Sequence, residues 1–289
     1  DGFHTPYPTP NGTNRPTAAR SSTCGWGPLW LRAPPVHCRA RRNITMDPVT
    51  LQVIGIVFVA TFVRGLTGFG NALVAMPLLA LVIDMKVASP LVAMTAILMA
   101  VLMLVTNWRQ VHIRSAWRLL LASAPGVYIG LKLLTSAEGP GLRIGLAIFI
   151  MSYSVYDLCR PRLAHLENEN WAYLAGFVSG VIGGACNANG PPIVIYGTMR
   201  GWNPEKFRAT LQGFFLPAGL FILVGHAAKG LWTDQVVHLF LWSLPSVFVG
   251  ITLGSLLAKR VKKEHFRVVI HTVLIGSALM LLWKALGGA

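Results

Sequence analysis

Residues 53–83, VIGIVFVATFVRGLTGFGNALVAMPLLALVI, decide the fold of this chain. The stretch is apolar except at Arg64 and around a glycine-rich interruption, Gly65-Leu-Thr-Gly-Phe-Gly70. Counted from Val49, the segment is too long for one straight helix across a hydrocarbon core of about 30 Å, and too short for two. We therefore expect a broken helix whose arms re-enter the membrane as half-helices.

The rest of the chain is equally apolar. Of its 289 residues, 54% are hydrophobic and 12% are charged, whereas soluble domains carry about 25% charged residues. Further apolar runs over 91–105, 211–224, 239–257 and 268–283 approach the roughly 20 residues needed to cross a bilayer. The predicted fold class is all-α, a polytopic membrane helix bundle.

Three sets of matches divide the chain into two related halves, which we place at residues 46–165 and 166–289. Each half opens with a broken segment, about 49–83 and about 171–199, and continues with three uniform apolar runs. Gly65, Gly68 and Pro77 match Gly180, Gly183 and Pro192 without a gap, 125–130 matches 245–250, and 142–144 matches 266–268. Residues 1–45 are rich in Pro and Arg and lack periodicity, so we expect a disordered tail.

Basic residues distinguish two topologies, because Lys and Arg collect on the cytoplasmic side of a membrane. If each broken segment enters and leaves on one face, thirteen Lys and Arg residues gather on one side and five on the other. Full crossing by both broken segments gives eleven against seven. We predict the first arrangement, which makes the halves inverted repeats with both termini outside; six arginines in the tail count against it. The larger set is Arg109, Arg114, Arg118, Arg160, Arg162, Arg200, Lys206, Arg208, Lys259, Arg260, Lys262, Lys263 and Arg267, and the smaller is Lys86, Lys132, Arg143, Lys229 and Lys284.

Several function classes are excluded. The net charge of +15 comes from the tail and from the ends of apolar runs, which is typical of membrane orientation and not of nucleic-acid binding. The four cysteines form no CxxC pair, and the chain has no HExxH, GxSxG or Walker A motif. We therefore predict no enzyme, no metal and no cofactor.

The two breaks predict a binding site for a small anionic substrate. Helix N-termini at membrane depth offer unpaired N–H donors and partial positive charge, and asparagine adds donors without a fixed charge. Glycines alone could serve close helix packing, but packing does not explain the asparagines. Arg64 is a second candidate for pairing with the anion, with snorkelling to the surface as the alternative. The predicted site residues are Arg64, Thr67, Gly68, Phe69, Gly70, Asn71, Gly184, Asn187, Asn189, Gly190, Arg208 and Gln212, of which Arg208 could instead be an orienting cytoplasmic charge.

The sequence does not determine which ion, if any, is coupled to transport. Asp84, Asp157 and Asp234 read as helix-end residues. Histidines within or near the apolar runs are candidates for a proton relay, although a lone histidine in a span more often serves a structural hydrogen bond. These histidines are His226, His238 and His271. Proton coupling and assembly into a homo-oligomer therefore remain alternatives.

The chain resembles the TauE/SafE family, the sulfite exporter or toluene sulfonate uptake permeases, from about residue 50 to 285. The resemblance is strongest at 64–77 and at 180–192 continuing into 207–215. It implies transport of sulfite, sulfoacetate or another organosulfonate across a bacterial inner membrane. One departure is Ala185-Cys-Asn-Ala-Asn189, where many relatives have a glycine-richer motif.

Three functional hypotheses are compatible with the sequence. A secondary transporter for a small sulfur-containing anion is the leading hypothesis. A passive anion channel is the alternative, which would show fast turnover independent of any proton gradient. A membrane scaffold without transport is the third.

Overall fold

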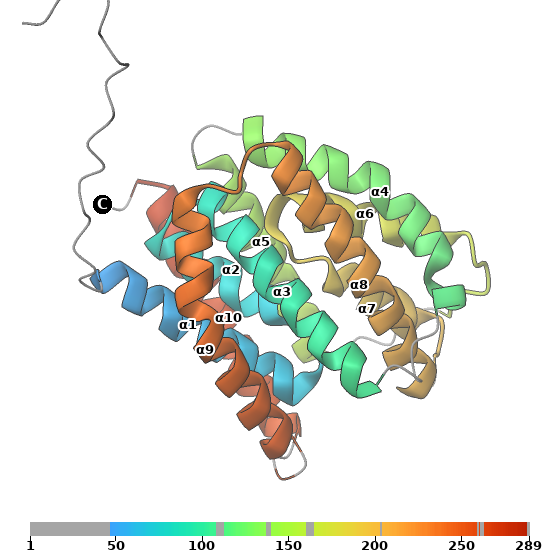
Figure 1. Cartoon of the computed structure of the whole chain (residues 1–289). Coiled ribbons are helices and arrows are strands. Elements are labelled where there is room, and N and C mark those ends of the chain that lie inside the picture. The colour runs from blue at the N-terminus through green and yellow to red at the C-terminus, as the bar shows by residue number, and fades with distance from the viewer. Residues whose placement is uncertain are drawn as a thin grey trace, which may run out of the picture. The chain divides into compact units, whose positions relative to one another are not determined.

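The computed structural model describes residues 47–107, 113–136, 140–159, 165–202, 204–258, 260 and 263–287. The predicted tail, 1–45, lies outside these ranges. Within them all regular structure is helical, without a strand. The helices are α1 Pro48–Thr67, α2 Asn71–Val82, α3 Met85–Asn107, α4 Ile113–Ser136, α5 Gly141–Cys159, α6 Trp171–Cys186, α7 Gly190–Met199, α8 Pro204–Ala228, α9 Asp234–Leu257 and α10 Lys263–Ala285 (Figure 1).

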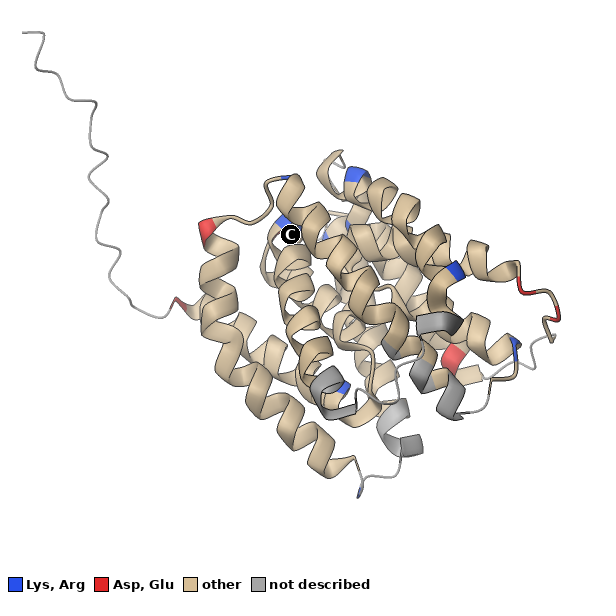
Figure 2. Ribbon diagram, turned by 45° about the vertical axis from the view of Figure 1, so that its right-hand side comes forward, with Lys and Arg blue, Asp and Glu red and all other residues tan. Residues whose placement is uncertain are grey.

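The membrane prediction is confirmed. Six of the described helices, α1, α3, α4, α5, α9 and α10, are long and apolar enough to cross a bilayer. Large hydrophobic side chains such as Leu121, Val224 and Leu256 are exposed on the surface of the bundle. The described charged residues lie mainly at helix ends and connections (Figure 2). An apolar belt with charged rims is the surface that a bilayer requires.

Both predicted helix breaks are present. Gly68 and Gly70 adopt left-handed backbone angles, with φ of 84° and 91°, which glycine reaches without steric cost. They end α1 and start α2 within three residues. Asn187 ends α6 in the same left-handed region, with φ of 58°, and asparagine tolerates this region better than most side chains. The proline pair after Gly190 falls in the first turn of α7 as expected, where a missing N–H costs nothing.

The two arms of each broken segment differ in length. The breaks come late in their apolar runs, so α1 has 20 residues and α6 has 16, whereas α2 has 12 and α7 has 10. At 1.5 Å per residue α1 alone could cross the hydrocarbon core. The two breaks do not fall at matching positions of the halves. The C-cap of α1, Gly68, lies three residues after Gly65, whereas the C-cap of α6, Asn187, lies seven residues after the matching Gly180. Measured from these glycines, α6 therefore continues about one helical turn further than α1.

The second broken segment returns to the face from which it enters. Leu166, before α6, donates its backbone N–H to the carbonyl oxygen of Met199 at the end of α7, at 2.9 Å. The guanidinium of Arg200 donates to the carbonyl oxygens of Leu166, at 2.8 Å, and Glu167, at 2.6 Å. The α6–α7 pair is therefore a helical hairpin with both ends on one side.

Two groups of charged residues favour the predicted topology over full crossing. Glu169 pairs with both Arg118 and Arg200. Full crossing would place these two arginines on opposite faces of the membrane. Lys284 shares a cavity wall with Lys86, and full crossing would separate these two as well. The inverted relation between the halves stays a prediction, which these contacts support.

The halves pack on each other reciprocally. α1 packs most extensively on α9, and α6 on α4, so that the first helix of each half meets the same helix of the other half (Figure 1). Glycines make both interfaces close. A methyl group at Gly184 would overlap the carbonyl oxygen of Val127, and one at Gly65 would lie 2.8 Å from that of Ile251. Small residues that let backbones approach are typical of membrane helix pairs.

Labelling single cysteines from either side of the membrane tests this topology. In a background without native cysteines, we expect Arg118→Cys and Arg200→Cys to react with a membrane-impermeant maleimide from one face. Lys86→Cys and Lys284→Cys should react from the other face. Reaction of Arg118→Cys and Lys86→Cys from the same face would contradict the arrangement.

Candidate functional site

A small cavity lies where the two breaks meet. Its volume is about 40 Å³, compared with about 10–15 Å³ for one enclosed water. The lining comes from both breaks and from α3 and α8: Arg64, Phe69, Gly70, Asn71, Ala72, Leu73, Ala96, Ile97, Asn187, Ala188, Asn189, Gly190, Pro191, Phe215 and Gly219. The cavity therefore has room for a ligand of a few non-hydrogen atoms, held between the two halves.

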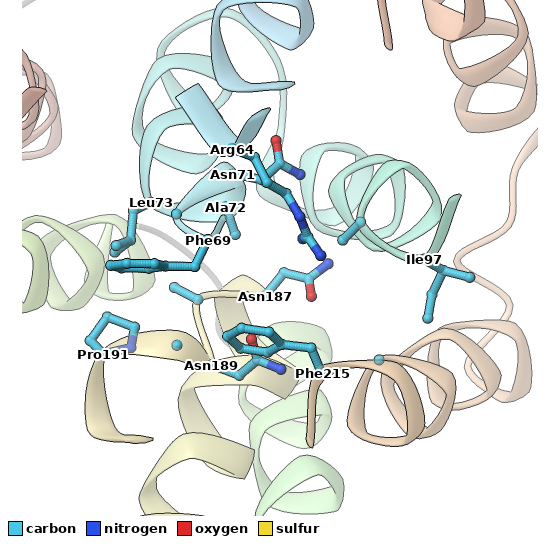
Figure 3. A pocket seen from close by; sticks show the side chains of 15 residues that line it. Arg64, Phe69, Asn71, Ala72, Leu73, Ile97, Asn187, Asn189, Pro191 and Phe215 are labelled. Carbon is cyan, nitrogen blue, oxygen red and sulfur yellow. The ribbon is translucent and has the colours of Figure 1, made fainter. Parts of the chain in front are cut away.

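Arg64 gives this cavity its charge. The side chain is 6% exposed and reaches from the last turn of α1 towards Asn187 (Figure 3). Its Nε and Nη2 atoms are buried without a hydrogen-bond partner, and no carboxylate among the described residues forms an ion pair with it. The ring of Phe215 lies 6.0 Å from the guanidinium carbon, a cation–π contact that compensates only part of the burial cost. Arg64 is therefore the candidate for pairing with an anion in this cavity.

The start of α2 adds neutral donors beside Arg64. Asn71 is 2% exposed, and its Nδ2 is buried without a partner. The first intrahelical bond of α2 runs from the Val74 N–H to the Gly70 oxygen. The N–H groups of the preceding residues 71–73 therefore lack intrahelical acceptors and carry the partial positive charge of a helix N-terminus. Asn71, Ala72 and Leu73 line the same cavity as the guanidinium, so these donors lie beside it.

The second break presents Asn187 and Asn189 from the opposite wall. The Nδ2 of Asn187 donates to the carbonyl oxygen of Ser89 on α3, at 3.3 Å, which anchors the side chain. The backbone oxygen of Asn189 accepts a hydrogen bond from the Ser179 hydroxyl, at 2.5 Å. Both asparagine side chains reach the cavity near Phe215 (Figure 3). These two contacts therefore hold the second break in position.

The structure brings together some of the predicted site residues and places others elsewhere. Thr67 turns its hydroxyl to the carbonyl oxygens of Val63 and Phe69 and stabilises the break. Gly68 serves the left-handed turn, and Gly184 packs on α4; none of these three residues lines the cavity. The side chains of Arg208 and Gln212 lie outside the described part of α8. Those that do line the cavity are Arg64, Phe69, Gly70, Asn71, Asn187, Asn189 and Gly190.

Comparison with known families identifies the family of this chain. The family described as Sulfite exporter TauE/SafE matches residues 53–281. The chain belongs to this family. The match spans most of the chain and includes both breaks and every helix that lines the cavity. No match was found among curated proteins or among solved structures.

Membership in the TauE/SafE family makes the chain an integral membrane protein of a transporter family, consistent with the absence of enzyme motifs. Among the described residues, no cluster of His, Cys, Asp and Glu could hold a metal ion.

Sequence reasoning missed the part of this TauE/SafE cavity that α3 and α8 line. Phe215 and Gly219, one turn apart on α8, and Ile97 on α3 line it, and Phe215 also contacts the Arg64 guanidinium. These residues lie in uniform apolar runs, where the sequence does not distinguish an aromatic ring that faces the interior from one that faces lipid. Only the spacing of Phe215 from Gln212, three residues on the same helix face, could have suggested it.

Proposed function

We propose that this chain is a secondary transporter that moves a small sulfur-containing anion, with sulfite as the best fit, across a bacterial inner membrane. The observation that carries the proposal is the guanidinium of Arg64, which has no ion-pair partner in the described part of the chain and lies in a cavity shared by the two halves. Family membership supports the sulfur chemistry of the substrate. The cavity supports its charge and its size.

The charge argument is one of compensation. A buried cation without a partner costs several kcal/mol, so the site favours any ligand that supplies negative charge. An oxyanion accepts from a guanidinium and from several N–H donors at once, because each oxygen has free lone pairs. Asn71 and the start of α2 offer such donors. An uncharged ligand of the same shape would leave the guanidinium uncompensated.

The size argument distinguishes sulfite from larger sulfonates. A cavity of about 40 Å³ corresponds to about three waters, which suits a four-atom oxyanion such as sulfite. Sulfoacetate has twice as many non-hydrogen atoms and requires the cavity to widen. We therefore expect sulfite to bind more tightly than sulfoacetate to this conformation.

Uptake of radiolabelled sulfite by proteoliposomes tests the proposed transport function and its site. We expect the wild-type chain to exchange sulfite across the membrane at a saturable rate. The double variant Asn71→Leu and Asn187→Leu should lose at least about tenfold in rate, because each removed donor that bonds a charged group contributes about 1.5–3 kcal/mol.

Two further measurements complete this test. The variant Asn168→Leu, which changes an exposed asparagine before α6, is the matched control and should keep the wild-type rate. A wild-type rate in the double variant would refute the site. Turnover that does not saturate with sulfite concentration would favour the passive channel.

A further inference from the structure

A buried histidine is joined to the anion cavity by polar contacts. His226, on α8, is fully buried, and its Nε2 lies 3.3 Å from the hydroxyl of Ser89. The carbonyl oxygen of the same Ser89 accepts from Nδ2 of Asn187, which lines the cavity. Ser89 therefore contacts the cavity wall with its backbone and the imidazole with its side chain.

The other imidazole nitrogen is available for a proton. Nδ1 of His226 is buried without a hydrogen-bond partner. If Nε2–H donates to the Ser89 hydroxyl, Nδ1 carries the free lone pair, and a proton taken up there converts the ring to an imidazolium. Lys229 follows three residues later, at the end of α8, and its ammonium lies 5.9 Å from the Tyr128 ring. His226 thus lies between this end of the bundle and the cavity.

Among the described residues, the helices around His226 carry no negative side chain that could balance an imidazolium. α3, α4, α6 and α7, which pack on α8, carry no carboxylate among their described side chains, and neither does the described part of α8. Their described titratable or charged groups are Lys86, Arg118, Tyr128, Lys132, Tyr173, Cys186 and Tyr196, and no hydrogen bond or ion pair joins any of these to His226. Asp84, just before α3, is exposed and accepts from the backbone N–H of Lys86.

We propose that His226 binds a proton together with the anion in the neighbouring cavity, which makes the transporter an anion–proton symporter. The inference rests on the proposed transport function. His226 follows the cavity residue Gly219 by seven residues, about 10 Å along a helix. At that separation, and with an effective dielectric constant of about 20, one charge changes the affinity for the opposite charge roughly tenfold. By linkage, the anion favours the proton as much as the proton favours the anion.

Proteoliposomes with radiolabelled sulfite separate transport from coupling. The first measurement is exchange, with equal sulfite and equal pH on both sides. The second is net accumulation driven by an inward proton gradient, after subtraction of uptake by protein-free vesicles. We expect the wild-type chain to do both. His226→Gln should keep exchange within about threefold but lose accumulation at least tenfold, because glutamine can bond Ser89 but cannot take up a proton.

The control is His238→Gln, at an exposed histidine that accepts from Trp242, and it should behave as wild type in both measurements. A second variant, Ser89→Ala, removes the hydroxyl but keeps the carbonyl that holds Asn187, and it should reduce accumulation more than exchange. Gradient-driven accumulation at the wild-type level in His226→Gln overturns the proposal. A wild-type chain that exchanges sulfite but does not accumulate it under the proton gradient overturns the proposal without any variant. Absent wild-type exchange refutes the transport function itself.

Discussion

Replacing Arg64 with glutamine is expected to weaken sulfite binding at least 30-fold and, without sulfite, to raise the unfolding temperature of the protein. Truncating a buried, charge-paired partner costs about 2–5 kcal/mol of binding energy, and 1.4 kcal/mol is a factor of ten. The guanidinium has no ion-pair partner among the described residues, so its removal relieves an uncompensated burial cost. Thermal unfolding in detergent, with and without sulfite, measures both effects.

Arg200→Gln is the matched control for this prediction, because Arg200 is a structural arginine. Its guanidinium bonds the oxygens of Leu166 and Glu167 and pairs with Glu169, so its loss should lower the unfolding temperature. The stabilisation of this variant by sulfite should remain that of wild type. If Arg64→Gln destabilises the protein as Arg200→Gln does, and keeps its response to sulfite, then Arg64 is structural and the site is wrong.

Replacing Gly184 with leucine is expected to abolish folding. Even a single methyl group there would overlap the carbonyl oxygen of Val127 and approach Leu131 on α4. Because these neighbours are backbone atoms, α4 and α6 would have to separate along their length. Overpacking of this kind costs about 3 kcal/mol or more, and no monodisperse protein should elute on size exclusion in detergent.

Gly145→Leu is the control for this substitution. Nothing lies within 4 Å of a methyl group built at Gly145 on α5, so the added side chain would project into lipid. This variant should elute and unfold as wild type. Wild-type behaviour of Gly184→Leu would show that α4 and α6 are not in close contact.

The fold was predictable from sequence because its main determinants are local. Apolar runs of membrane length, the glycines at 68 and 70, and the prolines after Gly190 each fix one element or one break. Arm lengths were not predictable in the same way, since glycine-rich stretches contain both packing glycines and breaking glycines. Gly184 and Gly68 belong to the same kind of motif, but the first packs on a neighbouring helix and the second turns the chain.

The candidate site could be predicted where polar residues interrupt apolar segments. It was missed where the residue that lines the cavity is itself apolar. An arginine and several asparagines in apolar segments stand out because burying them is costly, and Arg64, Asn71, Asn187 and Asn189 do share one cavity. Thr67 has the same polarity, but its hydroxyl is used by its own backbone. Phe215 is a phenylalanine in an apolar helix, and only tertiary structure shows that it covers Arg64.

The most direct test is a structure of the purified protein with selenite, which has the shape and charge of sulfite and an anomalous scatterer at its centre. We predict one strong anomalous peak within hydrogen-bonding reach of the Arg64 guanidinium, between Asn71 and Asn187. A peak elsewhere with this cavity empty, or an Arg64 paired with a carboxylate of the protein, would contradict the proposed anion site.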